Sequence, residues 1–148
     1  MGPYLVVFLP LAALIAVYLV SVQRKRSAAL SIYWHRQCTG QIWANTFPHA
    51  STSSIRDFLY IVVDAFGFPR SRALKLEPGD EVIGLYRACN PDPSGPDSLE
   101  LESLQLALCE SYGESRFKEL PDHVTFGELF SRAGGSRPNK SLERTRER

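Results

Sequence analysis

Residues 97–113 read Asp97-Ser98-Leu99-Glu100-Leu101-Glu102-Ser103-Leu104-Gln105-Leu106-Ala107-Leu108-Cys109-Glu110-Ser111-Tyr112-Gly113. The segment predicts an amphipathic helix, because Leu101, Leu104, Leu108 and Tyr112 recur at helical spacing and can share one buried face. The acidic and hydroxyl residues Glu100, Ser103 and Glu110 fall on the other face, where we expect solvent.

The start of this helix carries the chemically interesting side chain. Asp97 follows a proline and is the expected N-cap, and Glu100 three residues later completes a capping box. Ser98 is then the first helical residue, with its hydroxyl on the outside of the first turn. A phosphodiester built there would lie at the positive end of the helix dipole, beside unpaired amides. An ordinary helix start has the same residues, so this feature alone leaves both interpretations open.

The stretch resembles the prosthetic-group helix of acyl and peptidyl carrier proteins. Their motif is Asp-Ser-Leu followed by an acidic residue, spaced leucines and an aromatic residue near the helix end, and residues 97–112 follow it without a gap. The resemblance implies that Ser98 is the attachment point of 4′-phosphopantetheine, with Asp97 and Leu99 beside it in the cofactor-binding motif. The thiol of that arm would hold an acyl group as a thioester, in fatty acid or secondary metabolite biosynthesis.

The resemblance also implies partners of two kinds. A phosphopantetheinyl transferase would attach the arm to Ser98, using coenzyme A and Mg²⁺, and acyl-transferring enzymes would load and unload the thiol. Ser98 would be an anchor in this scheme and not a catalyst.

The chain around the motif, residues 53–133, has the size and the order of helices of such a carrier. The predicted elements are a helix from Ser53 or Ser54 ended by Gly67 and Pro69, a long loop over 70–96 with a short turn at 80–86, the helix from Asp97, and a short last helix capped by Thr125. We therefore predict an all-α fold, a small acyl-carrier-like helical bundle of three to four helices with a long loop between the first two.

The N-terminal region predicts a membrane anchor. Residues 5–22 carry no charge, and 18 residues of helix at 1.5 Å each span roughly 27 Å, near the thickness of a bilayer core. We expect one N-terminal transmembrane helix within residues 1–23. A cleaved signal peptide is disfavoured, because the basic cluster Arg24-Lys25-Arg26 follows the apolar run. The same cluster predicts a single-pass protein of the bacterial inner membrane, with its N-terminus outside and its domain cytoplasmic.

Two further segments flank the predicted carrier domain. Residues 24–52 are expected to form a juxtamembrane linker of partly helical character, with its aromatic side chains at the membrane interface. Residues 134–148 contain five basic residues and almost no apolar ones, which is typical of a disordered basic tail. We do not predict nucleic-acid binding by this tail.

The net charge of +1 conceals an acidic segment. The stretch from Glu77 to Glu102 contains seven acidic residues and the single base Arg87. An acidic face around the serine would attract basic partner enzymes. A loop whose acidic side chains are simply solvated would have the same composition, so both explanations stay open.

Little else in the sequence points to chemistry. The three cysteines have no close pairing, His35 and Cys38 are not followed by a second pair of metal ligands, and G-x-S-x-G, Walker A and G-x-G-x-x-G motifs do not occur. We predict no metal site, no catalytic residues and no enzyme activity. Two functions remain open: a membrane-anchored acyl carrier, or an unmodified carrier-shaped protein-interaction module at the cytosolic membrane face.

Overall fold

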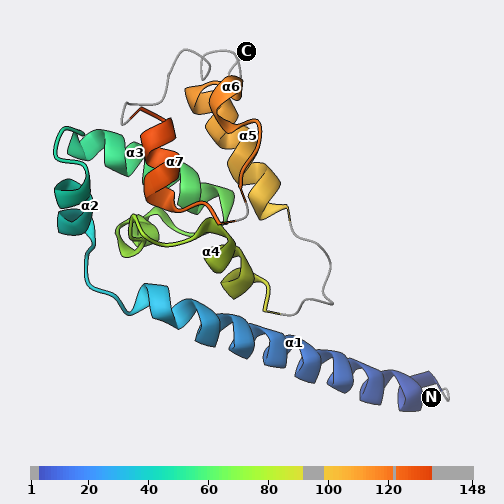
Figure 1. Ribbon diagram of the computed structural model, residues 1–148. Coiled ribbons are helices and arrows are strands. Elements are labelled where there is room, and N and C mark those ends of the chain that lie inside the picture. Colours follow the sequence, from blue (N-terminus) through green and yellow to red (C-terminus); the bar gives the residue numbers. More distant parts are fainter. Residues whose placement is uncertain (1–3, 92–98, 122, 135–148) are drawn as a thin grey trace, which may run out of the picture.

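The chain is mostly helical in the part that the structure describes. The computed structural model describes residues 4–91, 99–121 and 123–134 (Figure 1). Its helices are α1 (Tyr4–Trp34), α2 (Gly40–Thr46), α3 (Thr52–Ala65), the 3-10 helix η1 (Arg70–Lys75), α4 (Val82–Cys89), α5 (Glu100–Tyr112), α6 (Glu114–Phe117) and α7 (Phe126–Arg132). Within the described residues no strand forms, and Glu81 and Thr125 make only an isolated bridge. The prediction of an all-α helical bundle is confirmed, but the predicted long loop over residues 70–96 contains η1 and α4, so the bundle has more helices than the three to four expected.

Helix α3 supplies the largest buried face of the bundle. It starts where the Ser51 hydroxyl accepts a hydrogen bond of 3.0 Å from the Ser54 amide, and it ends before Gly67, whose φ of 68° favours glycine. The buried side chains of α3 include Ile55, Phe58, Leu59, Val62 and Val63. The predicted end at Gly67 and Pro69 agrees with this structure, and the start lies one or two residues earlier than expected.

Helix α5 packs on α3 through its leucine face. Leu104 and Leu108 have no exposed surface, and the Tyr112 ring lies 6.5 Å from the Phe58 ring. Leu101 is half-buried against the same core. The predicted buried face of this helix is therefore the observed one.

Helix α7 closes the bundle. The Thr125 hydroxyl accepts from the Glu128 amide at 3.2 Å, and the Glu128 carboxylate accepts from the Thr125 amide at 2.8 Å, which makes a complete capping box. Phe126 and Phe130 are fully buried, and the Phe130 ring lies 5.3 Å from the Phe58 ring.

Helix α2 contributes aromatic side chains to the same core. Trp43 is fully buried, its ring lies 5.7 Å from Phe130, and its indole nitrogen donates a hydrogen bond of 2.8 Å to the Leu76 carbonyl. Phe47 stacks on Trp43 and contacts Phe130 at 4.9 Å between ring centroids. The linker aromatics that we expected at a membrane interface therefore pack inside the protein.

Helix α1 does not end at the basic cluster as an anchor would. It continues through Arg24, Lys25 and Arg26 to Trp34, and its second half packs on α4, while its first half projects away from the bundle (Figure 1). Leu30 and Tyr33 near its end are buried in the core.

The predicted membrane anchor over residues 5–22 is not supported. Among the described residues, we find no helix with enough length and apolar character to cross a membrane. This finding contradicts the predicted single-pass localisation, with its outer N-terminus and cytoplasmic domain.

Truncation of the buried leucine face should destabilise the protein. Leu104→Ala leaves a cavity between α5 and α3 and should lower the free energy of unfolding by about 2–5 kcal/mol. Leu106→Ala is the matched control, because Leu106 lies on the same helix with 60% of its surface exposed and should change stability by less than about 0.5 kcal/mol. Urea denaturation followed by circular dichroism compares the two. Equal losses would contradict the observed orientation of α5.

The capping box should make stability depend on pH. Hydrogen bonds from the Thr125 amide and hydroxyl lower the pKa of the Glu128 carboxyl below 4.5. A lowered carboxyl pKa stabilises the folded state above the unfolded value, and this contribution is lost as pH falls through the folded value. Glu128→Gln should therefore melt below the parent chain at pH 7, and the gap should close below about pH 4. A gap that is independent of pH would exclude this role of the carboxylate.

Candidate functional site

The candidate site is the start of α5. The helix begins at Glu100 with Leu99 as its N-cap, and Leu99 makes no side-chain capping bond. This start is two residues later than predicted. The predicted N-cap at Asp97, with its capping box to Glu100, is therefore wrong. Leu99 is 72% exposed. Asp97 and Ser98 lie outside the described residues, and the role of Ser98 as the attachment point stays a prediction.

The two faces of α5 follow the sequence pattern with one exception. Ser103 and Glu110 are exposed as expected, and so are Glu102 and Leu106. Glu100, which we expected in solvent, is half-buried, and its Oε2 atom is buried without a hydrogen-bond partner among the described residues. The first turn of α5 therefore packs more closely on the protein than its polar sequence indicates.

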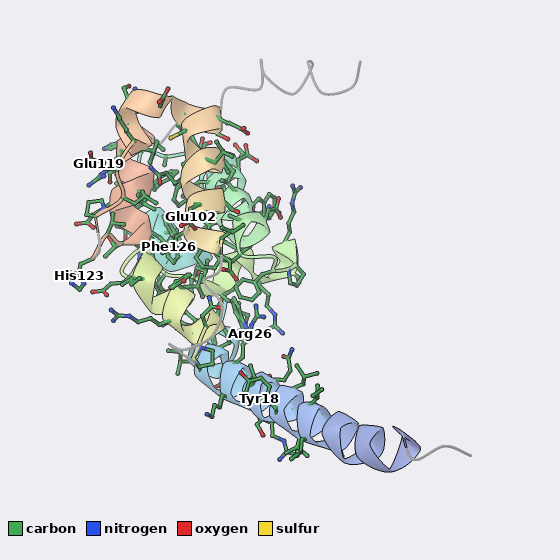
Figure 2. The ribbon with its side chains drawn as sticks, turned by 90° about the vertical axis from the view of Figure 1, so that its right-hand side faces the viewer. Tyr18, Arg26, Glu102, Glu119, His123 and Phe126 are labelled. Carbon is green, nitrogen blue, oxygen red and sulfur yellow. The ribbon has the colours of Figure 1, made fainter. Side chains whose placement is uncertain are left out.

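The neighbours of Glu100 come from α1 and α4. Burial raises the pKa of the Cys89 thiol to about 11, the nearby Arg26 guanidinium opposes this rise, and the Glu100 carboxylate adds to it. Figure 2 shows Arg26 where α1 meets the bundle and Tyr18 on the projecting half. Helix α1 thus reaches the region where α5 begins, which the sequence did not indicate.

The acidic segment does not form one continuous face. Arg36 donates to the Asp80 carboxylate at 2.6 Å and lies 3.8 Å from Glu77, and this hydrogen bond with Asp80 raises the pKa of the guanidinium. Glu81 lies 3.7 Å from His123. Glu102 is exposed, and it makes no ion pair with another described residue, in contrast to Glu77, Asp80 and Glu81.

Helix α4 was underestimated from the sequence. We expected a short turn at residues 80–86, and the structure has a helix that continues to Cys89 and buries Val82, Leu85 and Cys89. Its start is fixed to the segment before α7, because the Val82 amide donates to the Val124 carbonyl at 3.0 Å and the Phe126 amide donates to the Asp80 carbonyl at 3.0 Å.

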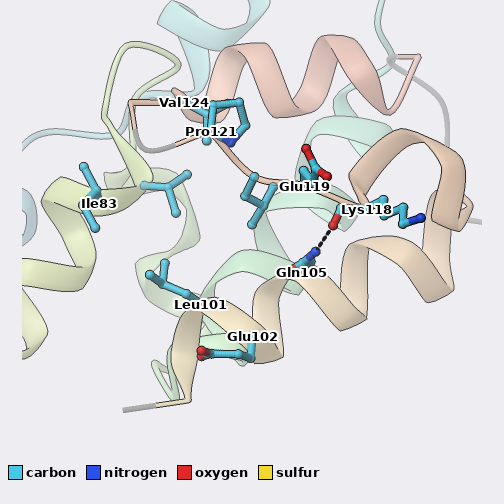
Figure 3. Close-up of a pocket in the computed structure, with 10 residues that line it drawn as sticks. Ile83, Leu101, Glu102, Gln105, Lys118, Glu119, Pro121 and Val124 are labelled. Carbon is cyan, nitrogen blue, oxygen red and sulfur yellow. Dashed lines mark hydrogen bonds between the residues drawn. The ribbon is translucent and has the colours of Figure 1, made fainter. Parts of the chain in front are cut away.

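A pocket of about 330 Å³ lies between α4, α5 and the segment that joins α6 to α7 (Figure 3). Its apolar lining consists of Val82, Ile83, Leu101, Leu120, Pro121 and Val124. Its polar lining consists of Glu102, Gln105, Lys118 and Glu119. The Gln105 side-chain amide donates to the Lys118 carbonyl and so ties the joining segment to α5.

Sequence reasoning missed this pocket. The leucine pattern placed Leu101 on the inner side of α5, and the short turn predicted at residues 80–86 was expected to pack Val82, Ile83 and Leu85 on the core. The pocket also needs Leu120, from a segment with no predicted element, and the full helix α4. The same apolar run was the available signal for that helix, because it matches the first turn of an amphipathic helix.

Other candidate chemistry is sparse in the structure. The three cysteines are free, with Cys38 exposed, Cys89 buried and Cys109 half-buried. The part of the chain that the structure describes contains no group of three or more His, Cys, Asp or Glu side chains that could hold a metal ion.

Comparison with models of protein families, with curated proteins and with solved structures finds no match to this chain. The carrier resemblance therefore depends on the motif in residues 97–112 and on the order of helices.

The close approach of α7 to the start of α4 predicts a sensitive glycine. A Cβ at Gly127 would lie 2.9 Å from the Pro78 carbonyl oxygen, whereas a Cβ at Gly79 would meet nothing within 4 Å. Gly127→Ala should therefore cost about 1–3 kcal/mol of stability through overpacking, and Gly79→Ala should be close to neutral. Chemical denaturation measures both. A neutral Gly127→Ala variant would show that this contact is looser than described.

Proposed function

We propose that this protein is an acyl-carrier-like protein that carries an acyl group on 4′-phosphopantetheine attached to Ser98. The cofactor would be 4′-phosphopantetheine, and the partners would be a phosphopantetheinyl transferase and acyl-transferring enzymes. The chain itself would not be an enzyme, because it would present the thioester and supply no catalytic side chain.

The observation that supports this proposal most is the packing of α5. The leucines and the tyrosine of the carrier motif occupy the buried face, and Leu99, which follows the candidate serine, is exposed at the start of the helix. Two other helices support it as well, since a long α3 before α5 and a capped α7 after it follow the expected order.

The attachment step is a phosphoryl transfer. The Ser98 oxygen would attack the phosphorus of coenzyme A that bears the pantetheine arm, forming a phosphodiester. The pyrophosphate bond of coenzyme A would break and release adenosine 3′,5′-bisphosphate, and the hydroxyl proton would pass to solvent. The new negative charge would lie near the N-terminus of α5, where the helix dipole favours an anion by about 0.3–1 kcal/mol.

The second candidate is an unmodified, carrier-shaped protein-interaction module. The exposed outer face of α5 favours it, because Leu99 and Leu106 are 72% and 60% exposed and are flanked by Glu102 and Glu110. Exposed apolar residues with charged neighbours are typical of docking surfaces. Such a module would use α5 without any group on Ser98.

Modification of Ser98 separates the two functions. The full chain, incubated with coenzyme A, Mg²⁺ and a broad-specificity phosphopantetheinyl transferase, should gain the mass of one phosphopantetheine. Ser98→Ala should gain none. Ser103→Ala, a matched change at an exposed serine of α5, should be modified like the parent chain.

The folded state must be checked in the same samples. Ser98→Ala should keep the circular dichroism spectrum and the melting temperature of the parent chain. An unchanged mass of the folded parent chain with several transferases would overturn the carrier proposal and favour the interaction module.

A further inference from the structure

A pocket lies beside the first turns of α5, the helix that follows the proposed attachment point. Leu101, in its lining, follows Leu99 by two residues, about 3 Å along the helix axis. An arm on Ser98, the residue before Leu99 in the sequence, would therefore start near this pocket. This inference rests on the proposed carrier function and concerns the group that the arm carries.

The centre of the bundle is occupied by aromatic rings. Trp43, Phe58 and Phe130 are fully buried and lie between 5.3 and 6.2 Å from one another, measured between ring centroids. Trp43 is also fixed by its hydrogen bond to the Leu76 carbonyl. Because protein cores are close-packed, a long chain could enter here only by displacing these rings.

The size of the pocket limits what it can cover. A volume of about 330 Å³ holds roughly ten groups of the size of a water molecule. Because the pocket is partly open to solvent, its apolar lining would cover only a short cargo of a few carbon atoms. Val82 and Val124 there are buried, and Ile83, Leu101 and Leu120 are half-buried.

The charges at the rim are mainly negative. The carboxylates of Glu102 and Glu119 lie on different sides of the pocket, while the Lys118 ammonium points away from it (Figure 3). For neither carboxylate is an ion pair recorded in the described part of the chain. A bound group with a further negative charge would be repelled by these two carboxylates, and its burial would cost the free energy of its hydration.

We infer that the cargo of this carrier is a short acyl group without a negative charge, held at the surface between α4, α5 and the segment joining α6 to α7. The apolar lining would cover its carbon atoms, and the rim would disfavour acyl groups that end in a carboxylate. The ring-filled core would leave the rest of a long chain in solvent.

Butyryl and succinyl groups test the charge requirement, because both contain four carbons and only succinyl ends in a carboxylate. A phosphopantetheinyl transferase would load each group from its coenzyme A thioester onto the full chain, and intact mass would follow hydrolysis of the thioester. Butyryl should hydrolyse at least about threefold more slowly than butyryl on free pantetheine, because burial of its methylenes holds the thioester at the pocket. Succinyl should show no protection.

A dodecanoyl group tests the size limit. It should be protected no more than butyryl, and it should not raise the melting temperature of the protein above that of the butyryl form. If protection from hydrolysis and the melting temperature both rose further with chain length, the core would have to open for long chains, and the inference would be overturned.

Two pairs of variants locate the effect. Leu101→Ser should abolish the protection of butyryl, whereas Leu106→Ser, on the exposed face of the same helix, should not. Glu119→Gln should give succinyl about half or more of the protection of butyryl. Glu110→Gln should not, because Glu110 is an exposed acid of α5 that does not line the pocket.

Equal protection of butyryl and succinyl on the parent chain would refute the inference alone. A parent chain that accepts no phosphopantetheine would refute the proposed function, and this inference with it.

Discussion

The burial of Leu104 and Leu108 against α3 fixes how α5 is rotated about its own axis. Both side chains have no exposed surface, and each fully buried leucine contributes about 1.5–3 kcal/mol relative to an exposed one. A rotation of α5 by half a turn would expose these leucines and bury Glu102 and Glu110. The orientation of Leu99, and with it the direction in which the candidate site faces, follows from this packing.

The residues before α3 support the same arrangement from the other side. Arg36 pairs with Asp80, and the Thr39 hydroxyl donates to the Leu76 carbonyl at 2.7 Å. The Trp43 ring then fills the space between α3 and α7. These contacts hold the segment from η1 to α4 against the bundle, so that α4 can form one wall of the pocket.

Much of the bundle was predictable because its signals are local. The burial pattern of α3, the leucine face of α5 and the Thr125–Glu128 capping box each follow from spacings of three or four residues. The carrier motif itself is of this kind. The start of α5 was less predictable, because Glu100 is buried by contacts with distant parts of the chain.

The features that sequence reasoning missed depend on distant partners. Trp43 lies in a segment without a sustained apolar period, and its contacts with Phe58, Phe130 and the Leu76 carbonyl make it a core residue. Likewise, α4 is stabilised by the second half of α1 and by the segment before α7. The apolar character of residues 5–22 was interpreted as a membrane span, an interpretation that the helices of the described residues do not support.

The most direct test of the proposed carrier function is peptide-level mass spectrometry of the protein isolated from its native host. The account predicts a peptide that carries phosphopantetheine on Ser98; the same peptide found entirely unmodified, from cells in which other carriers are modified, would contradict it.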